Sequence, residues 1–155
     1  ELIINIQGDE PLINPDAIDT LVEKFDKSLG IGNAYVYVND DYRLHDSNVV
    51  KVVTDLNNNA VYYSRFGIPY HKKEETPFKQ QLGLYAFNRH VLKMFEELEV
   101  GELEKAESVE MLRYIENGFA VRMIEVEDHG LSVDTEEDLK RVEEFLNAVH
   151  WCNRK

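Results

Sequence analysis

The pattern of apolar and polar positions first predicts a buried strand followed by an amphipathic helix. Residues 2–6 are apolar at four of five positions, and the run ends abruptly at the polar stretch Gln-Gly-Asp-Glu-Pro. Asn14 and Pro15 then suit the N-cap and the first position of a helix, and apolar residues follow them at helical spacing. We expect this helix to cover roughly residues 15–28.

The next part of the chain predicts strands. Residues 33–38 alternate between small or aliphatic residues and tyrosines, whereas residues 40–47 are polar and are expected to be irregular. A β-branched run at 49–54 and a second run typical of a strand at 60–64 flank three consecutive asparagines. Such an arrangement is typical of an antiparallel hairpin.

The remaining segments complete an alternation of strands and helices. In chain order we expect an exposed loop at 67–79, a buried strand at 83–87, helices at 89–98 and 104–117, a strand at 119–127 and a final helix that begins at 133. This order predicts an α/β fold in three layers, with a mixed sheet that contains one hairpin. No linker divides the chain, so residues 1–155 are expected to be part of a single domain.

Charge and cysteine content limit the partners and the cellular compartment that suit this chain. The chain has 155 residues, with 17 basic and 30 acidic ones, and a net charge of -13. This balance argues against nucleic acid or an anionic membrane as a partner, because phosphate binding needs surplus Lys and Arg. Cys152 is the single cysteine and cannot form an internal disulfide, which fits a reducing compartment such as the cytoplasm. No apolar stretch has the length of a membrane span.

Two aspartates stand where the chain reverses direction. Asp9 follows the first strand and Asp134 precedes the final helix. Carboxylates beyond strand ends are suitable ligands for Mg²⁺, provided that the fold brings the two together. Structural roles explain the same residues: Asp9 suits a turn, and Asp134 or the neighbouring pair Thr135 and Asp138 suits a helix cap.

Arg65, at the end of the hairpin, is a further candidate. Its guanidinium group could hold a carboxylate of a ligand with two hydrogen bonds, although a surface ion pair is the commoner use. No histidine has metal-ligand spacing to another His or Cys, and Ser64 has no base near it in sequence. The residues themselves therefore predict a magnesium site of low specificity and no nucleophilic catalyst.

Several ordered blocks of sequence resemble one enzyme family. The chain resembles the 3-deoxy-manno-octulosonate cytidylyltransferase (CMP-Kdo synthetase) family from residue 1 to about residue 146. The blocks that carry the likeness are INIQGDEPLI at 4–13, NVVKVV at 48–53, VYYSR at 61–65, LGLYAF at 82–87, EMLR at 110–113 and VDTEEDL at 133–139.

The resemblance implies a nucleotidyltransferase fold and a reaction. Members of this family transfer CMP from CTP to the sugar acid Kdo, forming CMP-Kdo and pyrophosphate for lipopolysaccharide biosynthesis. Family members form dimers, and Tyr35, Tyr37 or the loop at 66–80 could supply the contact. The implied site residues are Asp9 and Asp134 as catalytic Mg²⁺ ligands, and Gln7, Arg65, Gln81, Tyr85 and Glu110 in substrate binding.

The chain also departs from the family pattern. Gln81 replaces a histidine, Met111 replaces a glutamine that could hydrogen-bond to a sugar hydroxyl, and the loop between Arg65 and Gln81 is short. These differences leave two alternatives open. One is a cytidylyltransferase for 8-amino-Kdo or an acylneuraminate, and the other is a sugar-binding remnant without catalysis.

The family has a further segment before the first strand, with the glycine- and arginine-containing loop that grips the CTP phosphates. The expectation is therefore an N-terminally truncated chain that is inactive alone. The strand at 2–6 is then expected to be central in a larger sheet, since both of its edges would otherwise be exposed.

Overall fold

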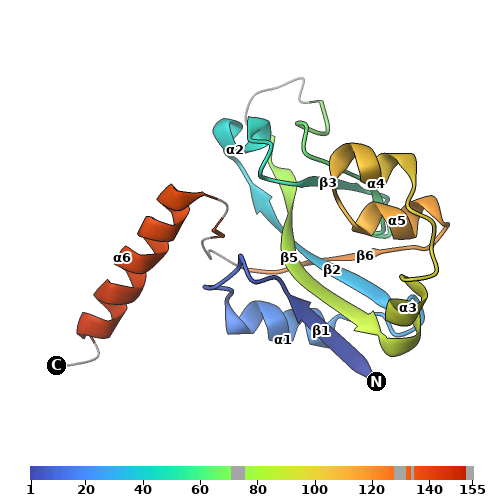
Figure 1. Cartoon of the computed structure of the whole chain (residues 1–155), viewed down its shortest axis with the longest axis horizontal. Coiled ribbons are helices and arrows are strands. Elements are labelled where there is room, and N and C mark those ends of the chain that lie inside the picture. Colours follow the sequence, from blue (N-terminus) through green and yellow to red (C-terminus); the bar gives the residue numbers. More distant parts are fainter. Residues whose placement is uncertain (71–75, 128–131, 134, 153–155) are drawn as a thin grey trace.

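The computed structural model describes residues 1–70, 76–127, 132–133 and 135–152. Strands and helices alternate around one sheet (Figure 1). The strands are β1 (Leu2–Ile6), β2 (Ile31–Val38), β3 (Lys51–Thr54), β4 (Ala60–Ser64), β5 (Phe78–Asn88) and β6 (Arg122–Glu125). The helices are α1 (Pro15–Glu23), α2 (Asp41–His45), α3 (Arg89–Met94), α4 (Glu102–Glu107), α5 (Met111–Glu116) and α6 (Glu136–Cys152).

The sheet is built around β5, which has 11 residues. Its order is β4-β3-β5-β2-β6, and β1 also pairs with β5. Because β2 pairs along β5 from residue 78 to 87, β1 and β3 share the opposite edge of β5, β3 near its beginning and β1 near its end. Only the pairing of β2 with β6 is parallel among the described strands, so the predicted mixed sheet is confirmed.

Helices cover both faces of the sheet, as predicted for three layers. On one face Leu21 of α1 packs with Leu84 of β5. On the other face Leu112 and Tyr114 of α5 pack with Phe87 of β5. Successive residues of a strand point to opposite faces, so β5 supplies both cores.

The predicted hairpin of β3 and β4 is confirmed, and its tip reaches the far edge of the sheet. The Ala60 amide donates to the Val121 carbonyl at 2.8 Å, and the Met123 amide donates to the Asn58 carbonyl at 2.7 Å. Asn58 adopts a left-handed conformation, φ 58°, that asparagine tolerates well. The sheet therefore curls until the β3–β4 hairpin meets β6, at the other end of the strand order. Tyr63 is fully buried inside the curled sheet.

The boundaries of several helices differ from the prediction. The first helix begins as expected at Pro15, with the Asn14 side chain accepting from the Asp16 amide at 3.0 Å, but it ends at Glu23. The helix predicted at 104–117 is two short helices, because Ser108 adopts a left-handed conformation, φ 54°, and ends α4. The segment 40–47, predicted as irregular, contains α2, and the Asp40 side chain caps that helix.

The first strand is less buried than its sequence predicts. Leu2 and Ile6 are 36% and 41% exposed. Among the described residues β1 pairs with β5 alone, and no strand lies along its other edge. The apolar run of β1 is therefore only partly covered in this structure.

The final helix stands apart from the sheet (Figure 1). Its start is capped by Thr135 and Asp138: the Thr135 amide and hydroxyl donate to the Asp138 carboxylate, and the Asp138 amide donates back to the Thr135 hydroxyl. This is the capping alternative considered from the sequence. None of the described helices is long and apolar enough to cross a membrane.

Candidate functional site

The candidate site lies on the edge of β5 between the end of β1 and the start of β3. The Gln81 amide donates to the Val50 carbonyl at 2.9 Å, just before β3. The Gln7 amide donates to the Gly83 carbonyl at 2.8 Å, just after β1. The turn at 7–11 therefore leaves the sheet at the middle of β5.

Gly83 permits this turn to lie directly on β5. A Cβ atom at Gly83 would lie 2.7 Å from the Gln7 side-chain oxygen, closer than real Cβ atoms approach, and 3.1 Å from Cγ of Glu10, which is a tight contact. The Gly83 amide also donates to the Glu10 carboxylate at 3.3 Å. Sequence reasoning missed Gly83 as part of the site; a glycine inside a strand was the available signal.

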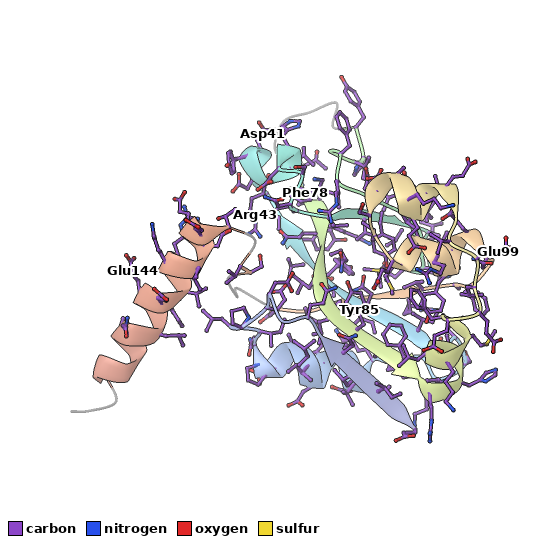
Figure 2. The ribbon with its side chains drawn as sticks, in the orientation of Figure 1. Asp41, Arg43, Phe78, Tyr85, Glu99 and Glu144 are labelled. Carbon is purple, nitrogen blue, oxygen red and sulfur yellow. The ribbon has the colours of Figure 1, made fainter. Side chains whose placement is uncertain are left out.

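Tyr85 and Gln81 form the buried part of the site. Tyr85 projects from β5 inside the molecule (Figure 2), and it is 8% exposed. The Gln81 side-chain amide donates to the Tyr85 hydroxyl and to the Leu82 carbonyl, both at 2.6 Å. This pair thus has a fixed orientation within the edge of the sheet.

The charges of three carboxylates act on the Tyr85 hydroxyl. Burial raises the pKa of Tyr85, the Gln81 hydrogen bond offsets part of this effect, and the charges of Glu110, Asp9 and Glu10 raise the pKa further. The phenol is therefore protonated at neutral pH and can donate a hydrogen bond to a ligand. The structure brings the predicted residues Gln7, Asp9, Gln81, Tyr85 and Glu110 to one place.

Asp9 is exposed, as a ligand-binding carboxylate should be. The turn around it is closed by the backbone, where the Glu10 amide donates to the Gln7 carbonyl at 3.1 Å. No hydrogen bond or ion pair joins the Asp9 carboxylate to the other described residues, so turn formation does not use it. Its oxygens remain available as ligand atoms.

Asp134, the second predicted metal ligand, lies outside the described residues. The residue before it is placed: the Val133 amide donates to the Asp9 carbonyl at 2.8 Å. A cleft of about 560 Å³ opens nearby and is lined by Glu10 and Ser132, among others. No group of three or more His, Cys, Asp or Glu side chains within the described ranges could hold a metal by itself. The exposed carboxylate of Asp9 still fits Mg²⁺, which commonly takes one or two protein carboxylates and completes its shell with phosphate and water.

Arg65 is placed differently from the other candidates. Its side chain donates to three backbone carbonyls: Nε to Glu107 at 2.8 Å, Nη1 to Ser47 at 2.9 Å and Nη2 to Ser108 at 3.4 Å. Among the described residues, the Arg65 side chain therefore binds backbone carbonyls, and not a carboxylate in the surface ion pair that is commoner for arginine. A guanidinium group has five N–H donors, so two remain for a ligand.

Met111, which takes the place of a glutamine in the family pattern, is packed in the core. It is 5% exposed and belongs to the core cluster around Tyr114 and Tyr85. The replacement of a polar residue at this position is therefore accommodated by apolar packing.

Comparison with known proteins identifies the family of the chain. The model of a family described as cytidylyltransferase matches residues 1–139. The chain belongs to the cytidylyltransferase family. The match confirms the family and the nucleotidyltransferase fold that the sequence blocks predicted.

Individual cytidylyltransferases of this family give the same result. The chain is 43% identical to the 3-deoxy-manno-octulosonate cytidylyltransferase of Solibacter usitatus, over 96% of this chain and 60% of that protein. It is 41% identical to the enzyme of the same name from Chlorobium limicola, over 94% of this chain and 62% of that protein. The chain thus spans about three fifths of the length of these relatives.

A solved cytidylyltransferase structure shares the fold closely. It is a CMP:2-keto-3-deoxy-manno-octonic acid synthetase complexed with CTP, with a TM-score of 0.86, 32% identity, and coverage of 95% of this chain and 62% of that one. A glucose-1-phosphate thymidylyltransferase from Bacillus anthracis has a TM-score of 0.57 at 18% identity, which shows a shared fold alone.

Proposed function

We propose that this chain is the sugar- and metal-binding part of a cytidylyltransferase that transfers CMP from CTP to Kdo. The observation that carries the proposal is the Gln81–Tyr85 pair at one edge of β5, beside the turn that carries Asp9 and within reach of the charges of Asp9 and Glu110. The similarity to a synthetase complexed with CTP supports the same reaction. The product would serve lipopolysaccharide biosynthesis, and the reaction would take place in the cytoplasm.

The residues suit the two substrates in different ways. Tyr85 can donate a hydrogen bond and Glu110 can accept one, which are the groups that sugar hydroxyls need. The two remaining N–H donors of Arg65 suit the carboxylate of a sugar acid. Asp9 and Asp134 would hold Mg²⁺, which neutralises triphosphate charge when bound.

The chemistry then depends mainly on position. The anomeric hydroxyl of the sugar forms a bond to the α-phosphorus of CTP, the bond from that phosphorus to the bridging oxygen breaks, and pyrophosphate leaves with the electron pair. The fixed Gln81–Tyr85 pair would orient the sugar for in-line attack. The hydroxyl proton is released during the reaction.

The experiment that tests this function measures pyrophosphate release by the protein at the full length that its gene encodes. CTP, Kdo and Mg²⁺ should give turnover, and residues 1–155 alone should give little. Activity with CTP and an acylneuraminate or 8-amino-Kdo in preference to Kdo would instead favour the alternative that Gln81 leaves open. Sugar binding without pyrophosphate release would identify a non-catalytic remnant.

We also propose a homodimer for the full-length protein. Phe66 and Tyr70, in the predicted contact loop, are 78% and 91% exposed, and Tyr37 is half-exposed. These aromatic side chains are available for a subunit contact, as large exposed apolar groups often are. Tyr35, considered from the sequence for the same role, is 2% exposed and belongs to the core.

A further inference from the structure

Glu107, which has no role in the sequence analysis, joins the end of α4 to the end of β4. Its carboxylate accepts three hydrogen bonds: from the Tyr62 hydroxyl at 2.9 Å, the Ser64 hydroxyl at 2.7 Å and the Arg65 amide at 2.8 Å. Its backbone carbonyl accepts from Nε of Arg65 at 2.8 Å. One residue therefore holds both the backbone and the side chain of Arg65.

A second charged residue holds Arg65 from the other side. Lys51 is fully buried, and its ammonium group donates to the carbonyls of Arg65 at 2.6 Å, Val49 at 2.6 Å and Asp46 at 2.9 Å. The amide of Arg65 is thus bound by Glu107 and its carbonyl by Lys51. The main chain of Arg65 has little freedom to move.

The same contacts also hold the segment between α4 and α5, which contains Glu110. Ser108 ends α4 in a left-handed conformation and presents its carbonyl to the Arg65 guanidinium group. Glu110 is two residues further on, at the start of α5. Any movement of Glu107 would therefore displace Arg65 and Glu110 together.

We propose that Glu107 is a positioning residue that sets the spacing between Arg65 and Glu110 for the sugar acid. This inference rests on the proposed function, in which those two residues contact the sugar. Glu107 itself is hydrogen-bonded on both carboxylate oxygens within the protein and does not touch the substrate. Its loss should weaken sugar-acid binding more than CTP binding.

The test uses two substitutions at Glu107 in the full-length protein. Glu107→Ala removes all three side-chain hydrogen bonds and should raise KM for Kdo about tenfold or more, with KM for CTP little changed. Glu107→Gln should be much closer to wild type. Its side-chain oxygen can still accept from the Arg65 amide, while the Tyr62 and Ser64 hydroxyls can rotate to accept from its NH₂ group.

Glu116, the last residue of α5, provides a matched control at the opposite end of α4. Glu116 accepts hydrogen bonds from the Leu103 and Glu104 amides, at the beginning of α4, and does not contact Arg65. Glu116→Ala should loosen α4 without a selective rise in KM for Kdo. Hydrogen exchange of the Arg65 amide gives a readout independent of turnover: it should be protected in wild type and in Glu116→Ala, and exposed in Glu107→Ala.

The outcomes separate the two proposals. If wild type is active and Glu107→Ala raises both KM values equally, or neither, the positioning role is overturned and the proposed function stands. Unchanged protection of the Arg65 amide in Glu107→Ala would also overturn it. If wild type does not use Kdo with CTP, the proposed function is wrong, and the positioning role falls with it.

Discussion

Two groups of charged residues in this molecule, an outward group and an inward group, differ in how they use their hydrogen bonds. In the first group, Asp9 and Glu110 are exposed, and no hydrogen bond or ion pair links their carboxylates to other described residues. In the second, the side chains of Lys51 and Glu107 form hydrogen bonds with backbone groups and hydroxyls of the protein itself. Arg65 belongs to the second group and borders the first.

The difference shows that charge alone does not identify a ligand-binding residue. A buried ammonium or carboxylate needs several partners to offset the loss of water, and Lys51 and Glu107 obtain them from the chain itself. An exposed carboxylate such as Asp9 keeps its capacity for a metal or a hydroxyl. We therefore expect substitutions in the inward group to affect stability first, and those in the outward group to affect activity first.

The largest expected effect is on stability, from Lys51→Met. The substitution would leave three partly buried carbonyls without their donor and should lower the free energy of unfolding by about 3 kcal/mol. Urea denaturation of the full-length protein measures this. A loss below about 1 kcal/mol would contradict the stabilising role of Lys51, since it would mean that water replaces the ammonium group easily.

Asp9→Asn should instead lower activity and leave stability nearly unchanged. Turnover should fall about a hundredfold or more, because the substitution removes the charge that we propose holds Mg²⁺, and metal-based charge stabilisation is worth several kcal/mol. The melting temperature should stay close to that of wild type, because Asp9 is exposed. Pyrophosphate release and thermal denaturation measure the two effects, and a large loss of stability would place Asp9 in the inward group instead.

Gly83→Ala tests the contact between β5 and the turn at 7–11 that follows β1. The added methyl group would meet the Gln7 side-chain oxygen at 2.7 Å, so the Gln7 side chain or the turn at 7–11 must shift. We expect a loss of stability of about 1–3 kcal/mol, as for other overpacked sites, together with lower turnover. Gly8→Ala is a suitable control, because no atom lies within 4 Å of a Cβ at that position.

The smallest expected effect is the pH dependence that Glu107 contributes. Burial raises the pKa of Glu107, but the hydrogen bonds from Arg65, Ser64 and Tyr62 outweigh burial and hold this pKa below its ordinary value of 4.5. The unfolded state therefore takes up a proton before the folded state does. The stabilisation is complete above that ordinary value and is lost as the pH falls through the lower folded pKa.

Unfolding free energies of wild type and Glu107→Gln from pH 7 to pH 3 measure this contribution. Their difference should be largest at neutral pH and should shrink in acid, since glutamine does not titrate. A difference that is constant across this range would show that the Glu107 charge contributes nothing.

Local chemistry made much of the fold predictable from the sequence. The cap at Asn14 and the hairpin around Asn58 depend on residues close together in the chain, and both are confirmed. The left-handed turn at Ser108 was missed, because helical spacing continues across it and serine gives no strong signal for that conformation. Its carbonyl accepts from Arg65, 43 residues away, which no local pattern contains.

The site was predictable only through the family resemblance. The blocks around Asp9, Tyr85 and Glu110 identified residues that the fold does bring together. The internal partners of Arg65, and the roles of Gly83 and Glu107, depend on contacts between distant segments and could not be read from spacing. The assignment of Asp134 as a metal ligand stays a prediction, because that residue lies outside the described part of the chain.

The most direct test of the central claim is a crystal structure of the full-length protein with CMP-Kdo bound. We predict that the sugar acid contacts Tyr85, Gln81 and Glu110 at the edge of β5, with Arg65 at its carboxylate and Glu107 still bound to the Arg65 amide. A sugar acid bound away from this edge, with Tyr85 and Glu110 out of contact, would contradict the account.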